Sequence, residues 1–271
     1  DFILSVSEKN KHILNEIKSL PVLIPAKQGN LKSLERLIKE MIKNKKEFLA
    51  DPILDPIHYG FAKSVDRYVK LRKKFPYIKI LMGTGNLTEL TDCESVGTNM
   101  ILMGLVSELS INAVLVVQVS NHCKNAIKET DAARKIMHFS KINQRLPFRI
   151  NNSLMCISER KAQRKSMKEL KEMKLMVKDK NFRIFLSDNS INVFNSETFT
   201  SGSDPYDFFD HMKVDDDASH AFYLGIELAR AQIAFQLGKN YDQDNELNWG
   251  IAVKKKKQNL LKRPELKITQ K

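Results

Sequence analysis

The chain has 271 residues, of which 42% are hydrophobic and 28% charged, so it can bury a core and form more than one domain. No apolar run reaches the roughly eighteen residues of a membrane-spanning helix, which excludes an ordinary transmembrane protein. The three cysteines, Cys93, Cys123 and Cys156, fit no zinc or disulfide spacing and predict reduced thiols in a cytoplasmic protein.

The net charge of +13 is concentrated in two stretches of the sequence. Residues 145–180 and residues 252–271 each carry a net charge of +7, so the rest of the chain is close to neutral. Neither stretch interleaves its basic residues with aromatic ones, as single-stranded nucleic-acid sites do. The pattern favours solvated charge in a linker and a tail over a nucleic-acid partner.

Strand and helix patterns alternate through the first 140 residues. Short apolar runs predict five strands, at residues 2–6, 21–26, 48–54, 79–82 and 113–119. Helix-like segments follow them, at residues 9–18, 31–42, 64–74, 95–109 and 121–140. We expect Ser64 to cap the third helix, and Glu129, Asp131 and Arg134 to lie on the solvent side of the fifth. Near-continuous apolar strands in βα units indicate a parallel sheet, with residues 113–119 as its most buried strand.

Five consecutive βα units fit either the later part of a (β/α)₈ barrel or one half of a doubly wound sheet. No glycine-rich phosphate fingerprint follows any strand, which disfavours a dinucleotide-binding sheet. Polar residues follow the strands instead, namely Lys27, Asp51, Asp55 and Asn86. Because barrel enzymes place their chemistry at the carboxyl ends of strands, we predict an α/β fold with a (β/α)₈ barrel-type domain over residues 1–141. Since the pattern begins inside a strand, we also expect this sequence to be part of a longer protein.

The second half of the chain has a different pattern. Residues 142–180 predict a basic linker with a helix near residues 159–176. Apolar runs at residues 182–186 and 191–194 flank a hairpin turn, and Asp204-Pro205 is typical of a helix start. Ser219 is expected to open a long helix over residues 220–237 that ends at Gly238. These elements predict a small α+β domain over residues 181–251, followed by a basic tail over residues 252–271.

Four phrases carry a resemblance to a known family: DPILDP at residues 51–56, MGTGNLTELTD at 82–92, HAFYLGIELARAQIAFQLGK at 220–239 and QDNELNWG at 243–250. With these phrases, the chain resembles the pterin-binding barrel family, which includes dihydropteroate synthases and corrinoid-linked methyltetrahydrofolate methyltransferases. It is most similar to the carboxyl-terminal part of the dihydropteroate synthase-related proteins of archaea and methylotrophs. The resemblance implies a pterin barrel followed by a small accessory domain.

The sequence departs from both branches of that family. Synthases have Asp-Pro-Gly-x-Gly-Phe-x-Lys, where this chain has Asp55-Pro56 and, with one extra residue, Gly60-Phe-Ala-Lys63. The Ser-Arg-Lys that synthases carry after the next strand is replaced by Gly-Asn-Leu at residues 85–87. Methyltransferases have Asp-Pro-Leu and Gly-Leu-Ser-Asn, which match the chain at residues 51–53 and 83–86. Their asparagine sits beside N5 of the pterin, so the resemblance implies the same contact for Asn86.

The predicted pterin site combines these residues. A carboxylate can accept from the two adjacent N–H groups on the pyrimidine edge of a pterin, and either Asp51 or Asp55 could do so. Asn86 would bond N5, while Gly83 and Gly85 would let the backbone lie against the ring. Lys27 and Lys63 are candidate phosphate contacts. The alternatives are a turn residue before proline for one aspartate, a left-handed turn for Asn86 and solvated lysines.

Other polar residues receive weaker assignments. His58 and His122 are read mainly as structural, and Glu89 as a capping residue. Residues 215–217 are read as a solvated helix entry, and no metal site or catalytic residue is assigned. In the long second-half helix, five large apolar residues are interpreted as core or interface: Phe222, Tyr223, Leu228, Ile233 and Phe235.

The resemblance implies a transferase that acts on a reduced pterin in folate- or tetrahydromethanopterin-type biosynthesis. Mg²⁺ would accompany a pyrophosphate substrate. The alternatives are a methyltetrahydropterin-dependent methyltransferase with a corrinoid protein as partner, and a non-catalytic pterin-binding or assembly subunit. A homodimer is also considered, and no membrane partner is expected.

Overall fold

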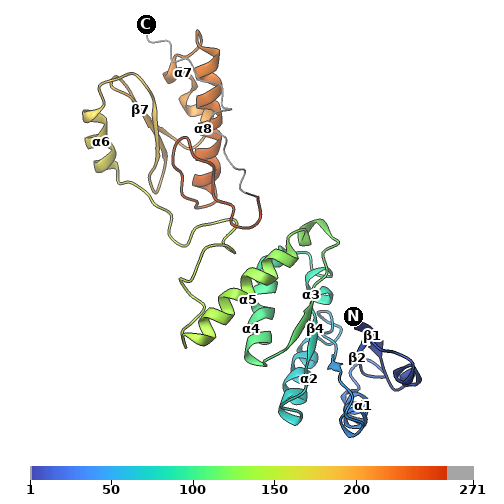
Figure 1. Ribbon diagram of the computed structural model, residues 1–271. Coiled ribbons are helices and arrows are strands. Elements are labelled where there is room, and N and C mark those ends of the chain that lie inside the picture. Colours follow the sequence, from blue (N-terminus) through green and yellow to red (C-terminus); the bar gives the residue numbers. More distant parts are fainter. Residues whose placement is uncertain (1, 255–271) are drawn as a thin grey trace. The chain divides into compact units, whose positions relative to one another are not determined.

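The computed structural model describes residues 2–254, which divide into two compact units at residue 154 (Figure 1). No helix within this range is long and apolar enough to cross a membrane. The second unit includes residues 155–180, which the sequence pattern assigned to a linker. Of the predicted basic tail, residues 255–271 lie outside the described part of the chain.

The first unit follows the predicted βα alternation. Its strands are β1 (Phe2–Val6), β2 (Leu20–Leu23), β3 (Leu49–Ala50), β4 (Leu81–Gly83) and β5 (Ala113–Leu115). Its helices are η1 (Lys11–Asn15), α1 (Leu31–Lys43), α2 (Phe61–Lys74), α3 (Gly85–Thr88), α4 (Ser95–Glu108), η2 (Asn121–Cys123) and α5 (Ala126–Ile142). The short helix α3 was not predicted, and it replaces the open glycine turn expected after β4.

All strand pairs of the first unit are parallel, and their order follows the sequence. β1 pairs with β2 and β2 with β3, while a bridge between Ala50 and Ile80 links β3 to the β4–β5 pair. A sequential parallel order arises when every crossover returns to the same side of the sheet, as in a barrel, whereas a doubly wound sheet reverses its order at a switch point. No closed barrel forms among residues 2–154.

Both faces of this sheet bury apolar side chains. Leu23, Ala50 and Met82 belong to the main core together with residues of α1, α2 and α4. The residues next to these in the strands form a second cluster. It consists of the buried residues Val22, Leu49 and Leu81, with Leu20 and Ala113 packed against them. Since successive strand residues point to opposite faces, this second cluster occupies the other face of the sheet, which in a barrel is the interior.

Three sequence expectations are wrong in the first unit. β5 is an edge strand, and Leu115 is exposed, so residues 113–119 are not the most buried strand. α2 begins after Gly60, and Ser64 lies inside the helix with its hydroxyl donating to the Phe61 carbonyl. Glu129 is buried, because Ser95 and Asn99 of the packed helix α4 donate hydrogen bonds to its carboxylate.

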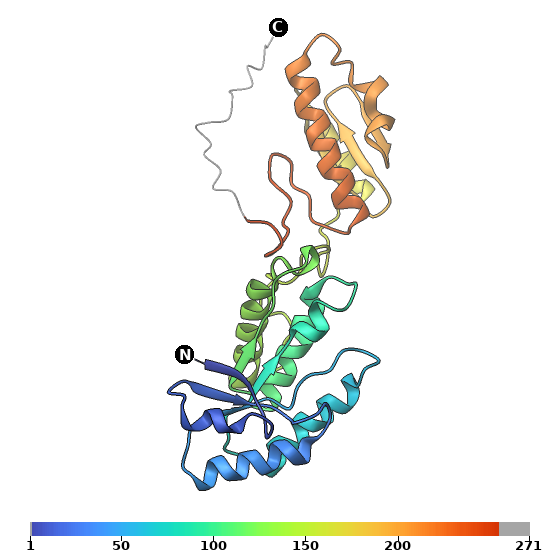
Figure 2. The same ribbon diagram turned by 90° about the vertical axis from the view of Figure 1, so that its right-hand side faces the viewer.

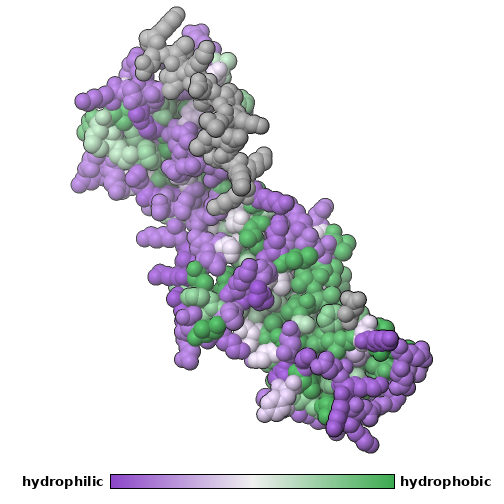
Figure 3. Space-filling model, viewed as in Figure 1, coloured by the Kyte–Doolittle hydropathy of each residue, from purple (hydrophilic) through white to green (hydrophobic). Residues whose placement is uncertain are grey.

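Hydrophobic side chains remain exposed at both edge strands of this sheet. Phe2 and Leu4 on β1 and Leu115 on β5 are each more than two-fifths exposed, as is Val119 beyond β5. Figure 3 shows hydrophobic surface over the region that holds β4 and α3 in Figure 1. Proteins usually protect such edges with charge, proline or a covering element.

The second unit is an antiparallel sheet between helices. Its elements are α6 (Met167–Met176), β6 (Arg183–Leu186), β7 (Ile191–Phe194), β8 (Phe199–Gly202), η3 (Pro205–Phe208), α7 (Phe209–Met212) and α8 (Ala218–Gln236). In Figures 1 and 2, α8 runs along one face of the sheet and α6 lies on the other. The predicted hairpin is confirmed, because Leu186 pairs with Ile191. α6 begins at Met167, later than predicted, after a capping box formed by Ser166 and Glu169.

Several helix boundaries of the second unit follow from local sequence chemistry. Asp204 caps η3 with proline in the first turn, as predicted. α8 begins one residue before Ser219, and its cap is Asp217, the last of the three consecutive acidic residues. Gly238 follows the helix with φ +62°, a left-handed conformation that glycine adopts without strain.

Candidate functional site

The predicted site residues lie in the loops that follow β2, β3 and β4. Lys27 follows β2, Asp51 and Asp55 follow β3, and Asn86 is the second residue of α3, directly after β4. Because these strands are neighbours and parallel, their carboxyl ends lie along one edge of the sheet. A contact supports this placement, since the Asn86 side chain donates a hydrogen bond to the Leu54 carbonyl at 2.8 Å.

Both oxygens of Asp55 have protein partners. Its Oδ2 lies 2.6 Å from the Arg67 guanidinium, and its Oδ1 accepts from the Gln28 amide at 3.1 Å. Arg67 also donates to the carbonyls of Pro52 and Ile53, so it holds the whole loop after β3. Both charged side chains are less than one-tenth exposed, and a pair of this kind cannot be opened for a ligand without a large cost. We therefore assign Asp55 to the structure of the loop.

Asp51 differs because one of its oxygens is free. Oδ1 accepts from the Tyr68 hydroxyl and from the Ile53 amide, both at 2.8 Å, whereas no described residue donates to Oδ2. Burial raises the pKa of Asp51 above its usual value, although the bonds from Tyr68 and Ile53 oppose that rise. Because no buried side-chain oxygen lacks a partner among the described residues, this free oxygen reaches solvent and is open to a ligand. A hydrogen bond from a ligand to this charged group would be stronger than one between neutral groups.

Tyr68 fixes the orientation of this carboxylate. It is 1% exposed, and burial together with the neighbouring Asp51 raises the pKa of its hydroxyl well above the usual value. The hydroxyl therefore stays protonated and remains a donor to Asp51. Asp51 Oδ2 is consequently the atom left to accept from a bound molecule.

The backbone between the two aspartates is strained. Ile53 has φ +64°, a left-handed conformation that is rare for a β-branched residue. Its amide donates to Asp51, and its carbonyl accepts from Arg67, so both ends of the residue are held. Strain of this kind persists only where the surroundings impose it, and it is concentrated at functional sites.

Asn86 presents an acceptor beside this loop. It is exposed and helical, not left-handed, so the predicted alternative of a turn asparagine is wrong. Its amide nitrogen is held by Leu54, which leaves the side-chain oxygen without a partner among the described residues. Gly85 lies close to the segment after β5, since a Cβ there would come within 2.7 Å of Val117, whereas a Cβ at Gly83 would meet nothing within 4 Å.

A hollow of about 690 Å³ adjoins these loops at the start of α2. Arg67, Lys63 and His58 line it together with Asp55 and Gln28. Lys63 is exposed, and His58 has φ +67° on an exposed loop. The first amide groups of α2 also point outward at its amino terminus, where anions are favoured. Lys27 is exposed and does not line this hollow.

Two other predicted residues act as structural links between strand ends. Glu89 accepts from the backbone amides of Val119 and Ser120. A bond from the Ser120 side chain, together with these two amide bonds, lowers the pKa of Glu89 to about 2. His122 Nε2 lies 3.0 Å from the Thr88 carbonyl. Both residues tie α3 to the segment after β5. The described residues contain no group of three or more histidine, cysteine or acidic side chains that could hold a metal ion.

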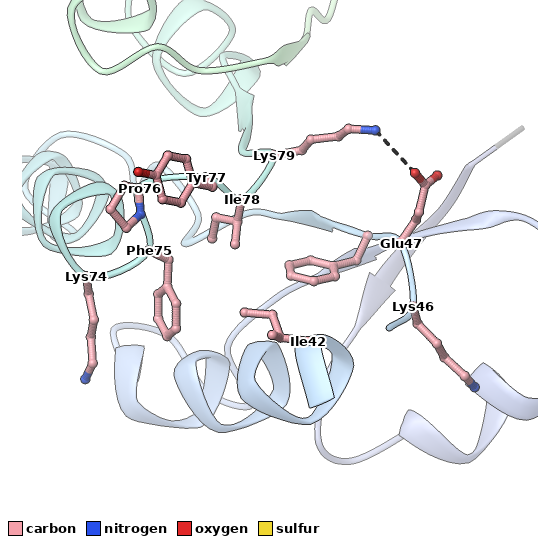
Figure 4. A pocket seen from close by; sticks show the side chains of 10 residues that line it. Ile42, Lys46, Glu47, Lys74, Phe75, Pro76, Tyr77, Ile78 and Lys79 are labelled. Carbon is pink, nitrogen blue, oxygen red and sulfur yellow. Dashed lines mark ion pairs between the residues drawn. The ribbon is translucent and has the colours of Figure 1, made fainter. Parts of the chain in front are cut away.

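A second hollow, of about 440 Å³, lies at the opposite ends of β3 and β4 (Figure 4). Phe48, Phe75 and Ile78 form its apolar part, and Lys79 at its rim lies 3.8 Å from Glu47. None of the predicted site residues lines it. It is more apolar than the first hollow but lacks convergent polar groups, so it does not change the assignment of the site.

The sequence analysis missed Arg67, Tyr68, Gln28 and Ile53 as parts of the site. A signal for two of them was present, since Ser64, Arg67, Tyr68 and Leu71 share one helical stripe and all are buried. An arginine and a tyrosine on the buried side of a helix require polar partners, which here are the two aspartates. Gln28 and the strain at Ile53 left no signal in the sequence.

Comparisons with known proteins give one informative match. The chain is 27% identical to an uncharacterized protein of the archaeon Methanocaldococcus jannaschii, over 91% of this chain and 54% of that protein. The chain therefore spans about half the length of this relative. No family model matches the chain, and no solved structure matches it.

Proposed function

We propose that this chain belongs to a transferase that binds a reduced pterin at the carboxyl ends of β3 and β4, within a (β/α)₈ barrel. The observation that carries the proposal is the free oxygen of Asp51, a partly buried carboxylate held by Tyr68 and by the strained loop residue Ile53. An N–H group on the pyrimidine edge of the pterin would donate to this oxygen. Because Oδ1 already accepts two hydrogen bonds, Oδ2 carries the recognition.

Two features of the sheet support the barrel part of the proposal. The parallel strands follow the sequence order, and a second apolar cluster covers the face opposite the helices. The exposed apolar residues on β1 and β5 would be covered if further strands continued the sheet on both sides. A chain with about half the length of its relative leaves room for such strands.

Asn86 extends the site toward the reacting part of the ring. Its free side-chain oxygen can accept from N5 when that nitrogen carries a proton, as in a tetrahydropterin or in a protonated N5-methyl tetrahydropterin, whereas its amide nitrogen stays bound to Leu54. This contact suits chemistry at N5 and therefore one-carbon transfer as well as pterin binding. Methyl transfer with a corrinoid protein as acceptor is accordingly the second candidate function.

The hollow beside α2 suits the anionic part of a synthase substrate. Lys63 and the amino terminus of α2 supply positive potential, and no described residue accepts from Arg67 Nη1, which lies near Gly29. A pyrophosphate leaving group would find charge stabilisation there. The described residues form no carboxylate cage, so Mg²⁺ would be held chiefly by the pyrophosphate itself. This arrangement favours synthase chemistry as the first candidate.

Calorimetric titration of the full-length protein with three ligands tests the proposal. The ligands are a dihydropterin pyrophosphate, an N5-methyl tetrahydropterin and an unsubstituted pterin. We expect Asp51→Asn to abolish binding of all three, and Asp66→Asn, at an exposed aspartate on α2, to leave binding unchanged.

Preference for the pyrophosphate, lost in Lys63→Ala, indicates synthase chemistry. Preference for the N5-methyl form, lost in Asn86→Ala, indicates methyl transfer. If none of the three ligands binds, the proposal is wrong.

A further inference from the structure

Helix α8 of the second unit has two apolar faces. One packs on the sheet through residues such as Leu224, Leu228 and Ala231. The other consists of six residues, which we call the outer stripe: Ala218, Phe222, Ile226, Ala229, Ile233 and Leu237. The four large members are 72%, 38%, 37% and 36% exposed in chain order. At 100° per residue the six side chains fall within a band about 100° wide that runs from the first residue of α8 to its C-cap, Leu237. The exposed polar residues Ser219 and Gln236 lie at the two edges of this band.

The outer stripe carries no charge. The acidic and basic residues of α8 are Glu227, which is buried, and Arg230, which donates to Glu227 at 2.6 Å beside the stripe. A solvent-facing helix normally alternates an apolar face with a charged one, and a helix that is apolar on both sides is normally covered on both. A continuous exposed apolar patch of this kind marks an interaction surface.

The spacing of the outer-stripe residues along the helix, four, four, three, four and four positions, is symmetric about its centre. Placing a two-fold axis between Glu227 and Leu228 brings residues at equal distance from the axis opposite one another in an antiparallel pair of helices. Phe222 then faces Ile233 of a second copy. Ile226 faces Ala229, and Leu237 faces Ala218, so in these two pairs a large side chain meets a small one.

We propose that the outer stripe is the interface of a homodimer in which two copies of α8 pack antiparallel across this axis. Isologous contacts require a surface that is complementary to itself, and a symmetrically spaced stripe in which two of the three pairs set a large side chain opposite a small one meets that requirement. The lack of charge removes the like-charge repulsion that a two-fold axis would otherwise impose. The interface is independent of the proposed pterin site.

The flank of the stripe also fits this arrangement. The same axis places Arg230 opposite Gly225, where a Cβ would meet nothing within 4 Å. The aliphatic part of the arginine side chain can therefore lie over the glycine of the second copy, with its guanidinium still bound to Glu227. A larger residue at position 225 would occupy this space.

Sedimentation equilibrium of the full-length protein at micromolar concentrations tests the interface. We expect the wild-type protein to dimerise and Ile226→Glu to be monomeric, because the two glutamates would be brought close together near the axis without solvent. Leu175→Glu serves as the matched control, since Leu175 is an 81% exposed leucine on α6 of the same unit. Unchanged circular dichroism shows that both variants fold. A monomeric wild type, or a dimer that survives Ile226→Glu, overturns the proposal.

Disulfide cross-linking tests the antiparallel register. In a background with Cys93→Ser and Cys156→Ser, Phe222→Cys chains and Ile233→Cys chains are oxidised separately and as a mixture. The two Phe222 positions lie about 17 Å apart along the paired helices, which is beyond disulfide reach, whereas Phe222 and Ile233 face each other. We expect cross-linked dimers only in the mixture. Cross-linking of either variant alone contradicts the antiparallel arrangement.

Discussion

The two units each contain a carboxylate that is held by tyrosine and by backbone amides, and the two differ in whether any oxygen is left free. Glu227 in the second unit is 1% exposed and accepts from Arg230 through Oε1 and from Tyr241 and the Asp244 amide through Oε2. Asp51 in the first unit accepts from Tyr68 and Ile53 through one oxygen, and the other has no described partner. Glu227, with partners on both oxygens, joins parts of its unit, whereas the free oxygen of Asp51 is the atom that we propose for ligand binding.

The surroundings of the two carboxylates show the same contrast. Around Glu227, the Tyr223 hydroxyl donates to Asp244 and accepts from Gln243, and Gln243 in turn bonds the backbone of β6. The segment after α8 is thereby fastened to the sheet. Near Asp51, the buried ion pair between Asp55 and Arg67 fixes the loop without using the free oxygen of Asp51. The predictions below address this difference, from the largest expected effect to the smallest.

Breaking the ion pair between Asp55 and Arg67 in the first unit should have the largest effect on stability. Arg67→Met leaves Asp55 buried without its cation and removes two bonds to the loop carbonyls. We expect the free energy of unfolding to fall by about 3–5 kcal/mol, measured by urea denaturation at neutral pH. The double variant Arg67→Met, Asp55→Asn should recover part of that loss, because it removes the unpaired charge. A loss below about 1 kcal/mol would show that the pair does not hold the loop.

Removing the Glu227 carboxylate from the second unit should have the next largest effect on stability. Glu227→Ala leaves the Tyr241 hydroxyl, the Asp244 amide and Arg230 without an acceptor. We expect a loss of about 2–3 kcal/mol in the stability of this unit. Trp249, the single tryptophan of the chain, lies in this unit and reports its unfolding by fluorescence. Glu227→Gln, which keeps an acceptor oxygen, should lose less than Glu227→Ala.

Asp51→Asn should separate ligand binding from stability. Burial raises the pKa of Asp51, so the folded protein binds this proton more tightly than the unfolded chain does. Ionised Asp51 therefore lowers stability as the pH rises through its raised pKa, and asparagine avoids that cost while keeping an acceptor for Tyr68. We expect the variant to be as stable as the wild type at acidic pH and more stable at neutral pH, by thermal unfolding. A variant that is less stable at every pH would make Asp51 a structural residue.

Glu89→Gln should have the smallest effect. The bonds from Ser120 and Val119 lower the pKa of Glu89 to about 2 from an ordinary value of 4.5. Its contribution to stability is therefore present above pH 4.5 and is lost as the pH falls toward 2. Because Glu89 is at the surface, we expect only a slight fall in the urea midpoint at pH 7 and none near pH 2. A larger loss at pH 2 than at pH 7 would contradict this interpretation.

Local chemistry in the sequence was sufficient to predict many of the elements. Apolar runs and helical spacing predicted the βα units. The helix cap at Asp204 and the hairpin before Ile191 also lie where the sequence predicts them. The positions of Asp51 and Asn86 after neighbouring strands could also be read from the sequence. Each of these features depends on residues within a few positions of one another, so the sequence alone determines them.

The tertiary structure decided which of these polar residues are paired with protein groups and which keep an atom free. Asp51 and Asp55 are equivalent in the sequence, and only the packing of α2 gives Arg67 to one and Tyr68 to the other. Likewise, Glu129 is buried because α4 supplies the donors for its carboxylate. Residues 113–119 lie at an edge of the sheet because no further strand pairs with β5 in the described chain. Hydrogen-bond partners of a buried carboxylate come from segments distant in sequence, so its role appears only when those segments are packed together.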